Sequence, residues 1–367
     1  MYLSDTILRI LLILLLYGFL FTACSNSVSD SSNDGHDNWI IPRDQVVSGG
    51  PGKDGIPSVD RPVFAKASEV QYIDDDRRVV GLRIGDTIRA YPHQILDWHE
   101  IVNDEVNGTP VAITHCPLTG TAIGWNRKVN GQVTEFGVSG LLFRNNLIPY
   151  DRHTDSNWSQ MQMRSVAGEL AGTDIKTEDL LETTWATWKS MYPDSEVLTR
   201  ETGYNRGYTG YAYGSTYSTD DSAILFPITH HDDRLDRKDR VHGVILERPA
   251  DEVAPVRVYP IKVFGEGVNV IQETLRGQRI LVVGSREHDF AASFRSTLPD
   301  GTQLEMKAVQ DALPVVMEDG EGNRWNLFGV AVEGPRKGQR LQPTHSYTGY
   351  WFAWVDFFPA LDLYQAD

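Results

Sequence analysis

The segment Val111-Ala-Ile-Thr-His-Cys-Pro-Leu-Thr-Gly-Thr-Ala122 decides the architecture around it. Its first four residues favour a strand, since β-branched side chains dominate them. Pro117 cannot donate to a central ladder and Gly120 favours a bend, so we expect this strand to end near Cys116. A thiol at a strand end can be aimed into a cleft, which makes Cys116 a candidate functional residue. Its structural alternative is a small buried hydrophobic side chain.

Composition limits the class of protein. Of the 367 residues, 41% are hydrophobic and 10% aromatic, which indicates a globular protein with a sizeable core. The formal net charge of −16 repels polyanions, so we expect no nucleic-acid partner. The chain has two cysteines, and the first, Cys24, lies in an N-terminal leader. A disulfide framework is therefore excluded, and an unpaired Cys116 in an oxidising compartment needs burial or a purpose.

The N-terminus has the pattern of an export signal. Residues 7–21 form an apolar run that is too short for a comfortable transmembrane helix but suits a signal-peptide core. The run ends in Phe21-Thr-Ala-Cys24, which is similar to the bacterial lipobox, where the cysteine is diacylated and becomes the mature N-terminus. We expect a lipoprotein signal peptide over 1–23, lipidation at Cys24 and a polar tether over 24–61. A plain secretory signal is the alternative.

The expected location follows from this leader. Ser25 at the second mature position favours the outer membrane in the usual bacterial sorting pattern. We therefore expect a cell-envelope protein, an outer-membrane lipoprotein facing the periplasm or the exterior. Its expected partner is the membrane, reached through the N-terminal lipid.

The chain also carries an internal duplication. Matching segments recur in the same order, among them Phe64–Leu82 with Phe226–Val244, Arg89-Ala-Tyr-Pro92 with Arg257-Val-Tyr-Pro260, and Trp185-Ala-Thr-Trp188 with Trp351-Phe-Ala-Trp354. The pattern predicts a first repeat unit over 62–199, a Tyr/Gly-rich connector over 200–223 and a second repeat unit over 224–364. The expected fold class is α+β, with mostly antiparallel strands, short helices and two tandem copies of one unit related by pseudo-two-fold symmetry. A cleft between the units is the natural place for a site.

Local patterns predict the elements of the first unit. Val79–Ile84 and Thr87–Tyr91 read as strands, and Pro92 to Val102 reads as a helix with proline in its first turn. Asn130-Gly131 is a strong hairpin signal. The tryptophans near residues 185 and 351 fall on one face of a short helix in each copy, and such stripes are typical of core packing.

The two copies differ where chemistry is expected. Cys116 aligns with Ser285, His115 with Gly284, and His99 lies near the position of Gly267. The candidate site therefore belongs to the first copy. If the helix extends far enough, His99 shares the buried face of Ile95 and Leu96, where a satisfied core histidine is the structural alternative.

A thiol beside an imidazole supports two kinds of chemistry. It forms a thiolate–imidazolium pair for nucleophilic catalysis, or it supplies S and N ligands to copper or zinc. The catalytic candidates are Cys116, His99, Ser139 and Gln160, and the metal-ligand candidates are Cys116, His99 and His115.

Taken together, these motifs resemble a bacterial and archaeal family. The residues that carry the resemblance are Tyr91-Pro92, His99-Glu-Ile-Val-Asn-Asp104, Cys116-Pro-Leu-Thr-Gly-Thr-Ala122, Phe136-Gly-Val-Ser-Gly140, Tyr150-Asp-Arg152, Thr154-Asp-Ser156, Trp158-Ser-Gln160 and Tyr350-Trp-Phe-Ala-Trp354. They are similar to the family catalogued as domain of unknown function 3179, over about residues 57–364. The resemblance implies no particular activity. Many members carry a second cysteine where this chain has Thr119, so dithiol exchange is not expected here.

Three functions remain open at this point. The leading hypothesis is a membrane-anchored extracytoplasmic protein whose first repeat builds a Cys116–His99 site for a soft transition metal, copper or zinc. The second is an enzyme with a single cysteine nucleophile. The third is a non-catalytic binding or scaffold module in which Cys116 is merely buried.

Overall fold

The computed structural model describes residues 38–214, 216–246 and 255–366. This part of the chain is mostly β, built from antiparallel sheets. Its three α-helices have seven residues each: α2 (His93–His99), α3 (Trp185–Met191) and α4 (Trp351–Phe357). Within these ranges no helix combines the length and apolar character needed to cross a membrane. The prediction of mostly antiparallel strands with short helices is thus confirmed, with less helix than an α+β fold usually has.

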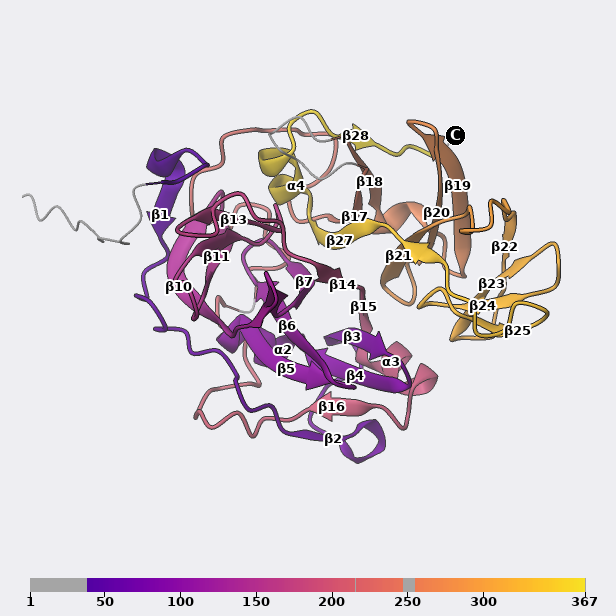
Figure 1. Ribbon diagram of the computed structural model, residues 1–367, viewed down its shortest axis with the longest axis horizontal. Helices are drawn as coiled ribbons and strands as arrows, with labels where there is room; N and C mark the ends of the chain where they lie inside the picture. The colour runs from indigo at the N-terminus through magenta and orange to yellow at the C-terminus, as the bar shows by residue number, and fades with distance from the viewer. Residues whose placement is uncertain (1–37, 215, 247–254, 367) are drawn as a thin grey trace, which may run out of the picture. The chain divides into compact units, whose positions relative to one another are not determined.

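The first half, residues 38–199, forms three sheets and a ribbon (Figure 1). One sheet has the order β15 (Leu180–Thr184), β3 (Arg78–Ile84), β4 (Thr87–Pro92), β16 (Glu196–Leu198) and β2 (Phe64–Lys66). The next has β14 (Thr177–Glu178), β7 (Thr121–Asn126), β6 (Thr109–Cys116) and β5 (Ile101–Val106). The third has β1 (Val46–Ser48), β10 (Phe136–Phe143), β11 (Asn146–Asp151), β12 (Asn157–Ser159) and β13 (Arg164–Ala167). The ribbon pairs β8 (Lys128–Val129) with β9 (Gln132–Val133) around the expected Asn130-Gly131 turn.

The second half, residues 224–366, forms three further sheets. The first has the order β27 (His345–Tyr350), β17 (Arg240–Ile245), β18 (Val256–Pro260) and β28 (Asp362–Leu363). The second has β19 (Asn269–Leu275), β20 (Gln278–Ser285), β21 (Phe290–Arg295) and β26 (Gln342–Pro343). The third has β22 (Met306–Ala308), β23 (Val315–Asp319), β24 (Arg324–Asn326) and β25 (Ala331–Glu333). Short 3-10 helices occur at η1 (Arg43–Gln45), η2 (Ala67–Glu69) and η3 (Ile261–Val263). The order β15-β3-β4-β16 has the same connectivity as β27-β17-β18-β28, including a parallel pairing of the last two strands in each.

Two predicted boundaries need correction. β1 lies inside the segment expected to be a polar tether, yet it pairs with β10, so the folded part begins before Arg61. Residues 1–37, which include the expected signal peptide and Cys24, lie outside the described ranges. The helix expected to reach Val102 ends at His99, because Glu100 adopts a left-handed conformation with φ 57° and the chain then enters β5.

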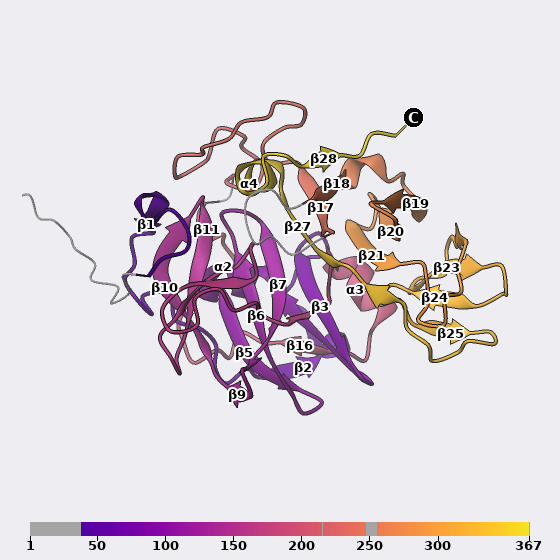
Figure 2. The same ribbon diagram turned by 45° about the horizontal axis from the view of Figure 1, so that its top comes forward.

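The halves interlock through their tryptophan helices. Trp188 of α3 packs in a core with Phe328 of the second half, at 6.4 Å between ring centroids. Reciprocally, α4 packs on the first half, where Phe357 meets Phe143 at 5.4 Å. The aromatic stripes are therefore core, as their spacing predicts. Figures 1 and 2 both show β27 running between the strands of the two halves, where it pairs with β17 and approaches β7.

Glycines make room for two of these tryptophans. A Cβ added at Gly81 would lie 1.9 Å from the Trp188 ring, and one added at Gly243 would lie 2.3 Å from the Trp354 ring. Both glycines occupy the same strand position in their sheets, β3 and β17. Close packing of an indole on a bare backbone thus occurs in each half.

Candidate functional site

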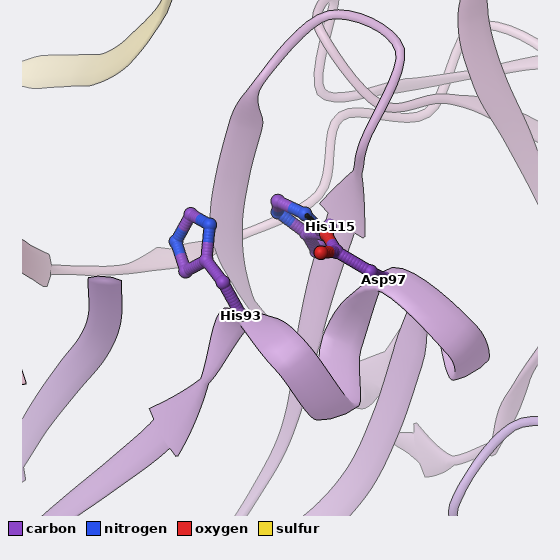
Figure 3. A group of neighbouring side chains, drawn as sticks. All are labelled: His93, Asp97 and His115. Carbon is purple, nitrogen blue, oxygen red and sulfur yellow. Dashed lines mark hydrogen bonds and ion pairs between the residues drawn. The ribbon is translucent and has the colours of Figure 1, made fainter. Parts of the chain in front are cut away.

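Helix α2 and strand β6 together position a cluster of three side chains. Pro92 lies directly before the helix, where its missing N–H costs no hydrogen bond. His93 and Asp97 are four residues apart in α2, so both project from one face of the helix. His115 comes from the end of β6, and its imidazole lies beside the Asp97 carboxylate (Figure 3).

The three side chains converge. One ligand atom from each of His93, Asp97 and His115 lies within 4.8 Å of the other two. His115 Nε2 and Asp97 Oδ1 are 2.9 Å apart, and the two imidazole centroids are separated by 4.5 Å. Asp97 and His115 are buried, whereas His93 is partly accessible. Two ring nitrogens and a carboxylate oxygen therefore lie close enough together to hold one metal ion.

Electrostatics keeps the first of these imidazoles neutral. Burial lowers the pKa of His93 well below its ordinary value, and His115, Arg78 and Arg240 lower it further. Within the described ranges, His93 Nε2 and His115 Nδ1 are buried without a hydrogen-bond partner. A neutral imidazole with an unpaired nitrogen is the form that binds a metal ion.

An ion-pair network surrounds the cluster and joins the two halves. Glu182 Oε2 of β15 lies 3.7 Å from His93 Nε2, and the same carboxylate pairs with Arg240 of the second half. Arg240 also pairs with Asp289, which Arg78 reaches through Nε at 2.7 Å. Burial raises the pKa of Asp289, but the two guanidinium groups outweigh this effect and the pKa is lowered overall.

A cavity opens beside the cluster. It has a volume of about 40 Å³, and its walls include all three cluster residues. By the same measure one buried water needs roughly 10–15 Å³, so the cavity holds a few atoms beyond the cluster. Other walls come from the connector, through Tyr211, Tyr213 and Tyr217, and from the second half, through Arg240 and Tyr350. The site therefore lies where the two halves and the connector meet, as expected for a cleft between units.

Cys116 points away from this cavity. Successive residues of a strand face opposite sides, so His115 enters the cluster while the thiol enters the core. Its Sγ lies 3.5 Å from the Asn145 carbonyl oxygen, and only 1% of the residue is exposed. Burial, assisted by the charge of Glu100, raises the pKa of Cys116 to about 11. A nucleophilic cysteine needs the opposite shift.

The structure does not bring His99 to Cys116. His99 Nδ1 lies 2.7 Å from the Pro57 carbonyl oxygen, and Nε2 lies 2.7 Å from the Tyr208 hydroxyl. Both nitrogens are thus engaged elsewhere, and burial lowers the pKa of the imidazole. The prediction of a Cys116–His99 pair is therefore wrong. His99 is a core histidine whose two nitrogens are hydrogen-bonded, and its contact with Tyr208 anchors the connector.

The remaining candidates serve the sheets. The Ser139 hydroxyl donates to the Ile148 carbonyl at the bulge of β10 and accepts from the Leu141 amide. Gln160 is buried, donates to Thr114 Oγ1 at 3.0 Å and accepts from Thr121 Oγ1 at 2.7 Å. The Ser139 bonds lie within the β10–β11 pair, and the Gln160 bonds join the end of β12 to β6 and β7 of the neighbouring sheet. Neither side chain lines the cavity.

Thr119 joins the same buried network. Its hydroxyl lies 2.9 Å from Thr121 Oγ1 and accepts from Asn146 Nδ2 at 2.9 Å. The position is therefore filled by a hydrogen-bonding side chain.

Of the predicted ligands, the structure retains His115 and adds His93 and Asp97. His93 was missed by the sequence argument, although two signals point to it. It precedes Asp97 by four residues in a helix, and the duplication places Ile261 and Gly265 at the corresponding positions of the second copy. The whole trio is thus present in one copy only.

The fold and the cluster define an antiparallel β protein with a His–Asp–His site between two interlocked halves. By its sequence the chain belongs to the family described as Protein of unknown function (DUF3179), whose model matches residues 53–361. No curated protein and no solved structure matches the chain.

Proposed function

We propose that this protein binds a divalent transition metal, zinc in the first place, through His93, Asp97 and His115. The observation that carries the proposal is the convergence of two imidazoles and one carboxylate within 4.8 Å. Zinc sites that bind a substrate use three such protein ligands and keep a fourth position open. The adjacent cavity supplies space for that fourth ligand.

The surroundings of the cluster support the same proposal. Burial holds His93 in its neutral form, so an incoming cation displaces no proton from it near neutral pH. Glu182 Oε2 lies 3.7 Å from His93 Nε2 and is fixed by Arg240, so a further carboxylate stands beside the nitrogen that would bind the cation and favours positive charge there. When bound, zinc would act as a Lewis acid on a ligand in the cavity.

The ligand set favours a zinc site over a copper site with a thiolate ligand. Cys116 lies on the other face of β6 and contributes no sulfur. Two imidazoles and a carboxylate form a borderline-to-hard donor set that suits zinc better than Cu(I). The proposed metal site therefore keeps the expected metal class and replaces Cys116 and His99 as ligands by His93 and Asp97.

Metal titration tests the proposal. The purified chain is titrated with zinc against a chromophoric chelator, beside His93→Gln, Asp97→Asn and His115→Gln. Each variant should lose at least roughly tenfold in zinc affinity, since even residues that only orient ligands contribute this much. His153→Gln is the matched control, because His153 is exposed and lies outside the cluster. Absence of stoichiometric zinc in the parent chain, or equal affinity in all variants, contradicts the proposal and leaves a scaffold role.

We further propose that the protein is an envelope lipoprotein held to the outer membrane through Cys24. The support is the Phe21-Thr-Ala-Cys24 motif after an apolar run and before a polar segment. Labelling of growing cells with a palmitate analogue tests it. The label should be present in the parent chain and absent in Cys24→Ala, and release of the unlabelled parent chain into the medium would indicate a plain secretory signal.

We infer finally that the two halves are copies of one unit related by pseudo-two-fold symmetry. The equal strand orders and the reciprocal packing of α3 and α4 support this relation. In this view one copy supplies the metal ligands, whereas the other keeps the fold and closes the site. Superposition of the two halves in an experimental structure tests it, and failure of equivalent strands to superpose would contradict it.

A further inference from the structure

The second half sends one hydroxyl into the cavity. Tyr350 ends β27, its backbone N–H donates to the Thr119 carbonyl at 2.8 Å, and its ring lies against Gly120. Among the described residues its hydroxyl has no hydrogen-bond partner, although the side chain lines the cavity. At the corresponding position the first half has Thr184, so this phenol occurs in one copy only.

Charges of both signs surround this hydroxyl. Burial raises the pKa of Tyr350 to about 12, while Arg78 and Arg240 act to lower it and Asp97 and Glu182 act to raise it. The phenol therefore stays protonated at neutral pH and is available as a hydrogen-bond donor. Tyr350 lines the same cavity as Asp97 and the two histidines of the cluster, so its side chain borders the space beside the proposed ion.

Arg78 provides a second set of donors. Its Nε is bound to Asp289, but its two terminal nitrogens have no partner within the described ranges, and 34% of the side chain is exposed. Arg240, at the equivalent position of the second half, uses both terminal nitrogens on Glu182 and Asp289. A free guanidinium fork matches the two oxygens of a carboxylate.

Cationic side chains on the cavity favour an anionic ligand. Arg78 and Arg240 line the cavity, and the ammonium group of Lys238 lies 3.3 Å from the ring centroid of Tyr217 and 4.9 Å from that of Tyr350, two further lining residues. A bound divalent cation would add positive charge beside these groups, and an anion in the cavity would offset it.

We propose that the cavity binds a small carboxylate anion at the open position of the metal, with Arg78 and the Tyr350 hydroxyl as its donors. The inference rests on the metal site proposed above. The volume of about 40 Å³ limits the ligand to a few atoms, which suits formate or the carboxylate end of a small acid. The second half thus completes the site of the first half, because Tyr350 supplies a phenol hydroxyl that the first half lacks at the corresponding position.

Formate titration tests this inference. Formate is titrated calorimetrically into the zinc-loaded and the metal-free chain, with sodium chloride at equal ionic strength as the reference. We expect binding to the zinc-loaded chain and much weaker binding without zinc. Tyr350→Phe should weaken formate binding roughly tenfold, as expected for loss of a hydrogen bond to a charged ligand, and Arg78→Lys should weaken it as well.

Tyr217→Phe is the matched control. Tyr217 also lines the cavity, but its hydroxyl donates to the Leu118 carbonyl at 2.9 Å and is not available to a ligand. Its formate affinity should change by less than about twofold. If zinc binds but formate does not, or if Tyr350→Phe binds formate as the parent does, the inference is overturned while the metal site stands. If zinc does not bind at all, both fail.

Discussion

Replacing Gly120 by alanine should destabilise the protein by more than the backbone conformation alone explains. Gly120 has φ +63°, in the left-handed region, and an added Cβ would lie 2.8 Å from Tyr350 Cζ. An alanine in this region costs roughly 1–2 kcal/mol. Overpacking adds typically about 1–3 kcal/mol, because the Tyr350 ring cannot withdraw: its backbone is bonded to Thr119 and its ring stacks on Phe352. The expected total loss is about 2–5 kcal/mol of unfolding free energy.

A second glycine separates the two contributions. Gly131 has φ +85° and nothing within 4 Å of an added Cβ, so Gly131→Ala should show only the backbone cost of roughly 1–2 kcal/mol. The assay is urea unfolding of the parent and both variants, followed by tryptophan fluorescence. Equal losses for Gly120→Ala and Gly131→Ala would refute the reasoning, since the contact between Gly120 and the Tyr350 ring would then carry no energy.

Three further predictions follow from buried groups. Burial lowers the pKa of His242 to about 3, so below about pH 6.5 the unfolded chain binds a proton that the folded chain does not bind. The free energy of unfolding should therefore fall with falling pH, by about 3 kcal/mol at pH 4.5. In acid unfolding curves, His242→Gln should flatten that slope. Burial raises the pKa of Cys116 to about 11, so in a Cys24→Ser chain iodoacetamide should alkylate Cys116 slowly at pH 8 and quickly once urea unfolds the protein. Fast labelling of the folded chain would instead support the hypothesis of a cysteine nucleophile. Gly81→Ala and Gly243→Ala should each cost at least about 1–3 kcal/mol, because each Cβ would enter an indole ring, and a mild effect in either half would show that the two tryptophan contacts differ in energy.

Local rules located much of the fold. The strands around Gly85-Asp86, the strand ending at Cys116 and the Asn130-Gly131 turn lie where their residue patterns place them. The aromatic stripes of α3 and α4 are core, as their spacing indicates. These features depend on neighbours within a few residues, and such preferences are written in short segments. The end of α2 was placed wrongly because a buried glutamate, Glu100, adopts the left-handed conformation that glycine usually supplies.

The candidate site could also be predicted from the sequence only in part. The sequence by itself places functional differences in the first copy and names His115, but it groups His115 with Cys116 and His99 as ligands of one site. It does not determine which face of β6 meets a helix. Tertiary structure decides that α2 covers the His115 face, that Cys116 faces the core, and that Tyr350 closes the cavity from the other half. The physical reason is that these contacts join residues as far apart as His93 and Tyr350, and long-range packing of whole sheets, which no local preference encodes, brings them together.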